Sequence, residues 1–500
     1  MGRSSQTDLV ADCDALLKQG RVGDVAKLIG KTSLAKIPRQ MIQPLAKICR
    51  RAGLIDQGIR LLHPLVRGAN SLAEPASVAE TSEYAVLLSR NGSVVEALEL
   101  LSKVDPASYP EAALYRAFCH ISSWEYAEAA QWLERFLVSE ADEYSKIVAR
   151  VNLGAAYLAT DRLTEAGALL DETIRIGEAS KAPRLVANSL EQKAHYWFRQ
   201  GEYAKARADL ARSETILGEG GYDRILVEKW KAIMAAIETK SLAPLEEFRR
   251  LAVEAKHFES VREADLFSLL VARNQSVFDY LYFGTPFAGY RQWIRRHVDL
   301  EPSDAFVLGA AAPAVVMDLE TGEVAGGKAG INSGKKVHQV FAALARDFYV
   351  PRNMGSLFHE LYPNEHYDID SSPGRVRQAI HRARKWLEAS GSPANIEFVN
   401  GSYAFAIVGS FGLKVPLERG SLEANEARWK LVLSQVKSTE FSAADVEKAL
   451  SLGRTSVLQL MQWAIEGGRV ERVGSEKQTR YRLTGVSGRD GETKRLSRAG

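Results

Sequence analysis

The residues best suited to chemistry are cations gathered in one short segment, RVRQAIHRARKWLEA at 375–389. Five of them, against the single carboxylate of Glu388, are Arg375, Arg377, Arg382, Arg384 and Lys385. Guanidinium and ammonium groups bind phosphates, and Arg side chains also hydrogen-bond the edges of guanine bases. A basic amphipathic helix can equally lie on an anionic membrane or simply face solvent. The neighbouring residues have to decide among these three interpretations.

Apolar residues in this segment recur with the spacing of one helix face. They are Val376, Ala379, Ile380, Ala383 and Leu387. This stripe predicts a buried face, and Arg377, Gln378, His381, Arg384 and Lys385 then lie on the opposite side. Alanines on the inner face suit close packing on other helices, and a strand, a Gly turn and a second strand follow at 396–408. The surroundings therefore favour a compact domain over a free membrane helix.

Other motifs that resemble catalytic or metal sites fail on spacing. GINSGKK (330–336) has three residues between its glycines and Lys after Lys335, whereas a phosphate loop needs four residues and then Ser or Thr. In HELYPNEH (359–366) the second His comes seven residues after the first, not four, and Pro363 interrupts the helix. His195 lies beside Tyr196 and is expected to pack in a helix pair. We therefore expect no enzyme, no catalytic residue, no metal and no cofactor.

Composition and cysteine usage limit the class of protein. The chain has 500 residues, a hydrophobic fraction of 46%, a charged fraction of 25% and a net charge of +3, which indicate several soluble globular domains. No apolar run reaches the ~18 residues of a membrane span, and the N-terminus lacks the apolar region of a secretory signal. The three cysteines show no pairing pattern. We expect a cytoplasmic protein without membrane contact.

The first ~280 residues read as successive helices with a repeat. Units at 83–103, 113–137, 152–178 and 191–217 each join a helix with small and aromatic residues to a second helix through a short polar turn. Tyr157 corresponds to Tyr196, and Ala129, Ala166 and Ala206 correspond to one another. These units resemble the tetratricopeptide repeat over 55–274. The resemblance implies an all-α helical-repeat solenoid that holds a protein or effector partner. An irregular helical domain without a ligand is the alternative.

The pattern changes near Ser303. Short apolar runs flank a turn at 320–323, and amphipathic helices follow at 337–348, 353–363 and 372–390. With the closing strands at 396–408, this order predicts a winged helix-turn-helix. Residues 315–407 resemble the OmpR/PhoB-type DNA-binding domain, through Ile380-His381-Arg382-Ala383-Arg384-Lys385-Trp386-Leu387 and the wing motif Gly401-Ser402-Tyr403-Ala404-Phe405.

That resemblance implies that the third helix enters the major groove of double-stranded DNA. The residues expected to contact DNA are Arg375, Arg377, Gln378, His381, Arg382, Arg384, Lys385 and Asn400. Asn400 stands where many members of the family have an arginine that enters the minor groove, so the helix would carry most of the specificity.

A second unit at 425–485 resembles the generic winged-helix domain of bacterial regulators. Helices are expected at 425–438, 441–450 and 453–468, followed by an alternating hairpin at 469–483. Leu452, Val457, Leu460, Met461 and Ala464 should face inward. Residues expected to face DNA are Arg454, Thr455, Ser456, Gln459, Lys477 and Arg480. Winged helices also serve as protein-binding modules, so DNA contact by this unit stays open.

The fold class expected from the sequence is thus a multidomain chain, with an all-α helical-repeat solenoid and two α+β winged helix-turn-helix domains. The expected parts are the tetratricopeptide-like domain 1–285, a connector 286–302, the OmpR-like domain 303–410, a linker 411–424, the second winged helix 425–485 and a disordered basic tail 486–500. The expected function is that of a bacterial transcription regulator. The alternative is an interaction scaffold whose winged helices do not bind DNA. Whether the protein forms a homodimer stays open.

Overall fold

The computed structural model describes residues 4–18, 21–33, 37–68, 74–218, 223–310, 312–326, 331, 334–399, 401–417, 424–436, 438–450, 452–474 and 479–484. They fall into two compact units. The first consists of residues 1–301, 346–376 and 398–403, and the second of 302–345, 377–397 and 404–500. The predicted domain 303–410 therefore contributes residues to both units.

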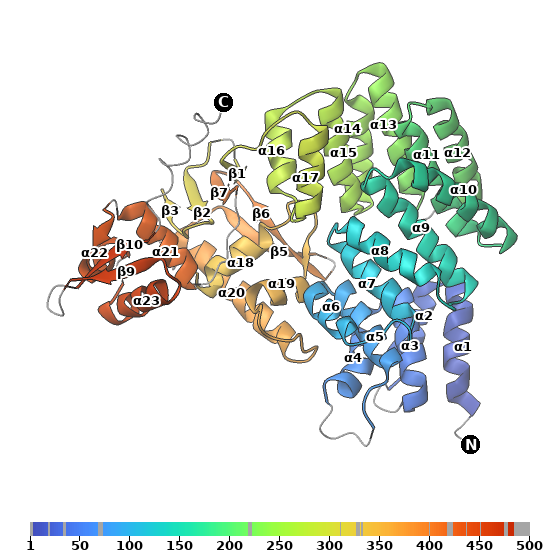
Figure 1. Ribbon diagram of the computed structural model, residues 1–500, viewed down its shortest axis with the longest axis horizontal. Helices are drawn as coiled ribbons and strands as arrows, with labels where there is room; N and C mark the ends of the chain where they lie inside the picture. Colours follow the sequence, from blue (N-terminus) through green and yellow to red (C-terminus); the bar gives the residue numbers. More distant parts are fainter. Residues whose placement is uncertain are drawn as a thin grey trace, which may run out of the picture. The chain divides into compact units, whose positions relative to one another are not determined.

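The first unit is built from helices that follow one another along the chain (Figure 1). They are α1 (Ser4–Lys18), α2 (Val22–Gly30), α3 (Arg39–Arg51), α4 (Ile55–Val66), α5 (Val78–Arg90), α6 (Val94–Ser102), α7 (Glu111–Ser122), α8 (Tyr126–Leu137), α9 (Glu143–Ala159), α10 (Leu163–Ala179), α11 (Pro183–Arg199), α12 (Tyr203–Leu217), α13 (Arg224–Thr239), α14 (Ala243–Glu254), α15 (Phe258–Val271), α16 (Gln275–Phe283) and α17 (Ala288–His297). Consecutive helices from α3 to α16 pack as hairpins.

The turns inside these hairpins share one backbone geometry. Trp124, Asp161 and Gly201 have positive φ angles of 60°, 61° and 75°. The next residue then donates its N–H to a carbonyl five residues back, as from Arg162 to Tyr157 at 2.9 Å. This bond satisfies a carbonyl at the end of the first helix and reverses the chain, as in a Schellman turn. The short polar turns seen in the sequence are therefore equivalent structures.

The aligned small residues lie where the helices come closest. Ala129, Ala166 and Ala206 are each completely buried, in α8, α10 and α12. At Gly167 a Cβ atom would lie 2.9 Å from Cζ of Tyr196. Small side chains thus admit the neighbouring helix, and an aromatic ring from the next hairpin fills the space. The predicted tetratricopeptide-like helical repeat is confirmed in this region.

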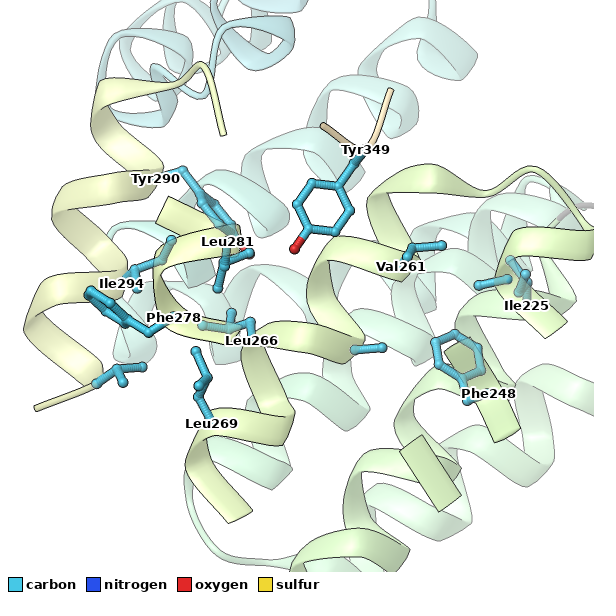
Figure 2. Close-up of a cluster of buried hydrophobic side chains, with 13 residues drawn as sticks. Ile225, Phe248, Val261, Leu266, Leu269, Phe278, Leu281, Tyr290, Ile294 and Tyr349 are labelled. Carbon is cyan, nitrogen blue, oxygen red and sulfur yellow. The ribbon is translucent and has the colours of Figure 1, made fainter. Parts of the chain in front are cut away.

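Residues 286–302, predicted as a connector, contain helix α17. Tyr290 and Ile294 are four residues apart on this helix and are only 1% and 0% exposed. They join a buried cluster with Phe278 and Leu281 of α16 (Figure 2). Burying these two side chains requires one face of a helix, which is why the segment is ordered rather than a simple linker.

Residues 346–376 also belong to the first unit, although they come after the repeats. They form β4 (Arg352–Asn353), α19 (Met354–Leu361) and the start of α20 (Ser372–Ser390). Tyr349 joins the cluster of α15–α17 (Figure 2). Beside it, Arg262 of α15 is 2.7 Å from the carboxylate of Asp347, and both side chains are buried. An apolar contact and an ion pair together fix this segment against the last repeats.

The second unit contains a four-stranded sheet in the order β1-β7-β2-β3. Its strands are β1 (Ala305–Gly309), β2 (Val315–Asp318), β3 (Val324–Ala325) and β7 (Phe411–Pro416). β7 lies antiparallel to β1 and parallel to β2, with Leu413 opposite Leu308 and Met317. The prediction that 411–424 is a linker is therefore wrong for 411–416. These residues form an inner strand because Phe411, Leu413 and Val415 alternate into the core.

Further elements complete the predicted order of helices and strands. Helix α18 (Lys336–Leu344) precedes α19 and α20, and β5 (Ala394–Val399) and β6 (Ser402–Ile407) follow. The sheet order here is β4-β6-β5.

The C-terminal part of the second unit has its own small core. It comprises α21 (Ala424–Gln435), β8 (Glu440–Phe441), α22 (Ala443–Leu450), α23 (Arg454–Glu466), β9 (Val470–Val473) and β10 (Arg480–Leu483). Val457, Leu460, Met461 and Ala464 of α23 are buried, and Leu452 packs against this core. The predicted inner face of α23 is confirmed. The predicted tail 486–500 lies outside the described residues.

Candidate nucleic-acid interface and repeat pocket

Helix α20 buries the face that its sequence predicts. Val376, Ala379, Ile380, Ala383 and Leu387 are all at most 3% exposed. Because these positions occupy one side of the helix, the side chains between them point outward. The apolar stripe therefore fixes which polar residues α20 can offer to a partner.

Five of the predicted DNA contacts on α20 are exposed, namely Arg377, Gln378, His381, Arg382 and Lys385. Residues four apart on a helix are neighbours, so Arg377, His381 and Lys385 form one row. Gln378 and Arg382 form a second row beside it. Donors of two chemical kinds, cations and an amide, thus share one face of a single rigid helix.

Two other predicted contacts on α20 are engaged within the protein. Arg375 is 2.8 Å from the carboxylate of Glu365, and its guanidinium lies over the ring of Tyr362 at 3.9 Å. The bond to Glu365 raises the pKa of Arg375 above its ordinary value. Arg384 is half-buried and donates from Nε to the carbonyl of Ile396 in β5 at 2.9 Å. The guanidinium groups of these two arginines are therefore bound to other parts of the protein and are less available to a partner.

The residues of the C-terminal part that were predicted to contact DNA differ in their exposure. Thr455, Gln459 and Arg480 are exposed, and Arg454 is 3.0 Å from Glu447. Ser456 is half-buried and lines a groove of about 680 Å³ together with Lys335 and Leu450. Asn400 and Lys477 lie outside the described residues. The structure does not bring the predicted residues of α23 into one continuous basic face.

The repeats enclose a pocket of about 310 Å³ that the sequence did not reveal. Alternate helices α9, α11, α13 and α15 each contribute to its lining, and α17 adds Tyr290 and Trp293. Glu191, Gln192, His195 and Arg199 of α11 line it at the spacing of one helix face. His195 also stacks on Trp230 at 4.3 Å, as its expected packing role requires. A regular i, i+4, i+8 polar row on α11 was the signal available beforehand.

A buried charge network lies at this pocket. Nζ of Lys229 is 2.9 Å from Glu263 and 3.7 Å from Glu191, whose carboxylate also accepts from Nε1 of Trp230 at 2.6 Å. Burial alone would lower the pKa of Lys229, but the two carboxylates raise it. Burial raises the pKa of Glu191, opposed by the Lys229 ammonium. Burial also lowers the pKa of His195 well below its ordinary value, so its imidazole is neutral at pH 7.

None of the helices in the described ranges is long and apolar enough to cross a membrane. The same ranges hold no group of three or more His, Cys, Asp or Glu side chains arranged to ligate a metal ion.

Comparisons with known proteins bear on the repeat region. No family model and no curated protein matches the sequence. Among solved structures, the chain resembles kinesin light chain TPR-like repeats from Podosopora anserina, with 22% identity over 36% of this chain and 97% of that one, and a TM-score of 0.30. It resembles the apo form of RapI with 11% identity over 56% and 86% of the two chains, and a TM-score of 0.38. BtubC (BKLC) from P. vanneervenii gives 15% identity over 44% and 92%, and a TM-score of 0.30.

Proposed function

We propose that the protein is a bacterial DNA-binding transcription regulator. The outer face of α20 lies in the major groove of double-stranded DNA, and the helical repeats bind a protein or effector partner. The observation that carries the proposal is the exposed double row of Arg377, Gln378, His381, Arg382 and Lys385 on a helix whose other face is buried.

This face suits DNA because it combines two kinds of donor. Arg and Lys neutralise phosphates, which supplies affinity, and Arg or Gln can form paired hydrogen bonds with base edges, which supplies specificity. α18, α19 and α20 followed by the strands β5 and β6 give the element order of a winged helix. The resemblance of 315–407 to the OmpR/PhoB-type domain supports the same role, and α21–α23 with β8–β10 would be the second winged helix.

Salt-dependent binding of the full chain to a random-sequence duplex tests the DNA contact. The affinity of a protein that neutralises phosphates falls with salt, at a logarithmic slope of about 0.9 for each phosphate. We expect the triple variant Arg377→Gln, Arg382→Gln and Lys385→Gln to bind more weakly, with a slope smaller by up to ~2.7. Fluorescence anisotropy at several salt concentrations measures both quantities.

The matched control removes equal charge from the repeats. Arg175→Gln, Lys256→Gln and Arg296→Gln alter three exposed cations of the first unit. This triple variant should keep the wild-type slope. If both triple variants and the wild type bind DNA with the same slope, α20 does not contact DNA. The protein would then be better described as an interaction scaffold with packing modules. A symmetric footprint on a selected site would indicate that it binds as a homodimer.

A further inference from the structure

The pocket in the repeats contains buried polar groups without partners. Within the described part of the chain, no hydrogen bond reaches Oη of Tyr290, Nε1 of Trp293, Oε1 of Gln192 or Nη1 of Arg199. All four residues line the pocket. Tyr290 is only 1% exposed, so its hydroxyl cannot be satisfied by bulk solvent. An unpaired buried polar group is costly, and such a group in a cavity points to something that binds there.

The unpaired groups have a definite chemical bias. Trp293 and Arg199 can only donate through these atoms, Tyr290 can donate or accept, and the amide oxygen of Gln192 can only accept. The Lys229 ammonium is already engaged by Glu191 and Glu263 and is not one of the unpaired groups. The charge of Arg199 is partly matched by Asp161 at 2.7 Å, yet one of its nitrogens stays unused. The unpaired donors of the pocket therefore favour a ligand that accepts hydrogen bonds.

Several aromatic rings form part of the pocket wall. Trp124, Trp230 and Phe267 line it together with Trp293 and Tyr290. Rings prefer offset-stacked and edge-on contacts with other rings, which favours a flat unsaturated ligand over a branched aliphatic one. The volume of about 310 Å³ is at the lower end of the range for small-molecule sites. A single or fused ring system is of suitable size, whereas a folded peptide is too large.

We propose that this pocket binds a small planar aromatic molecule that carries a hydrogen-bond-accepting group, for which a carboxylate is the best match. Tyr290, Trp293 and Arg199 bind the acceptor, and the aromatic walls hold the ring. The inference rests on the effector part of the proposed function and gives that effector a chemical class. It does not require that α20 binds DNA.

Calorimetric titration of the full chain without DNA tests the site. The probes are indole-3-carboxylate, indole, which lacks the carboxylate, and cyclohexanecarboxylate, which lacks the aromatic ring. We expect indole-3-carboxylate to bind measurably at millimolar concentration or below, and each of the other two to bind at least fivefold more weakly. If indole-3-carboxylate does not bind, or if either control binds as tightly as it does, the proposal is overturned.

Two conservative variants locate the binding. Trp293→Phe and Tyr290→Phe each keep an aromatic ring but remove one unpaired donor, so each should weaken indole-3-carboxylate about fivefold, the effect of one hydrogen bond. Trp132→Phe is the matched control, because Trp132 of α8 contacts Arg116 and does not line the pocket. Thermal unfolding checks that each variant is folded. Equal affinities for the wild type, Trp293→Phe and Tyr290→Phe would place the ligand elsewhere and overturn the assignment.

The result is separable from the DNA test. Absence of probe binding, together with the expected smaller salt slope of the α20 triple variant, would refute the pocket alone. Probe binding together with an unchanged slope in the α20 triple variant would refute the DNA contact alone.

Discussion

Two sets of cations, one in each unit, differ in whether a carboxylate pairs with them. In the repeats, Lys229 and Arg262 are buried and Arg50 is half-buried. They lie 2.9, 2.7 and 2.6 Å from Glu263, Asp347 and Glu83. In the second unit, Arg377, Arg382 and Lys385 stand exposed on α20, and in the described ranges no carboxylate pairs with them. The chain carries a net charge of only +3. What makes a cation available to phosphate is therefore its lack of an internal partner, not the overall charge.

The buried pairs also differ from the exposed face in what they do for stability. Removing two charges from water is expensive, and the attraction between them recovers this only if both remain. Breaking such a pair should therefore be costly, whereas neutralising an exposed arginine should leave the fold unaffected. The following predictions test this contrast, beginning with the largest effect.

Replacing Arg262 with Met should be the most destabilising change. It leaves the carboxylate of Asp347, which is 3% exposed, buried without its cation, and such losses amount to about 3–5 kcal/mol. Urea unfolding followed by circular dichroism measures the change. Arg250→Met is the control, because the Arg250 side chain is 72% exposed and its ion pair with Glu247 is long, at 3.8 Å. Equal stability of the two variants would contradict the proposed difference between buried and exposed pairs.

Gly167→Ala should destabilise the repeats less, by about 1–3 kcal/mol, the usual effect of overpacking a core. The new methyl group would lie 2.9 Å from the ring of Tyr196, so one of the two helices has to move. Gly23→Ala is the control, since nothing lies within 4 Å of the added atom. Thermal unfolding should show a lower Tm for the first variant and an unchanged or higher Tm for the second.

The second unit should lose stability in mild acid through His338. Nδ1 accepts from the N–H of Gly334 at 2.9 Å, and Nε2 bonds the carbonyl of Leu319 at 3.1 Å, so the buried ring is held neutral. Burial lowers the pKa of His338 below 6.5. The unfolded chain then binds a proton that the folded chain does not, and stability falls as the pH drops below ~6.5, by up to ~1.4 kcal/mol per pH unit.

The variant His338→Gln should flatten this part of the pH profile, even though it lowers stability at pH 7.5. Urea unfolding between pH 7.5 and pH 5 compares the two slopes. The same slope in both proteins would mean that His338 is not the group that takes up the proton.

The smallest effects distinguish two arginines on one helix. Arg382→Gln should lower the salt slope of DNA binding by ~0.9 without changing stability, because its side chain is exposed. Arg384→Gln should instead lower the unfolding free energy by about 1 kcal/mol, since its bond to Ile396 is lost, and leave the slope nearly unchanged. Anisotropy and urea unfolding on both variants check this. A reversed pattern would mean that Arg384 releases the carbonyl to bind phosphate.

Local patterns in the sequence predicted much of the fold. The equivalence of Ala129, Ala166 and Ala206 and the apolar stripe of α20 depend on residues within one or two turns of helix, and both are found. Helix α17 was missed because Pro286 and Gly289 look like a connector, although Tyr290 and Ile294 have helical spacing. Strand β7 was missed because its partner β1 lies about one hundred residues earlier, a pairing that no local pattern contains.

The candidate sites show the same limit. A helical wheel places Arg377 and Arg384 on the outer face of α20, but it cannot show that β5 supplies a carbonyl to Arg384. The repeat pocket is harder still to predict. Trp124 comes from the turn between α7 and α8 and Trp293 from α17, far apart in the chain, and only the stacking of hairpins brings them together. Local sequence patterns could predict which residues are exposed. They could not predict which residues already bind another part of the protein.

The pairing of Arg262 with Asp347 also sets an order of events during synthesis. The two residues are 85 positions apart, so at ~5–20 residues per second the ribosome delivers Asp347 about 4–17 seconds after Arg262. Until then the last repeats have a guanidinium without its buried carboxylate and lack Tyr349 in their core. A nascent chain of ~300 residues, or a gene fragment cut there for expression, would therefore leave the final hairpins incompletely folded and exposed to proteases.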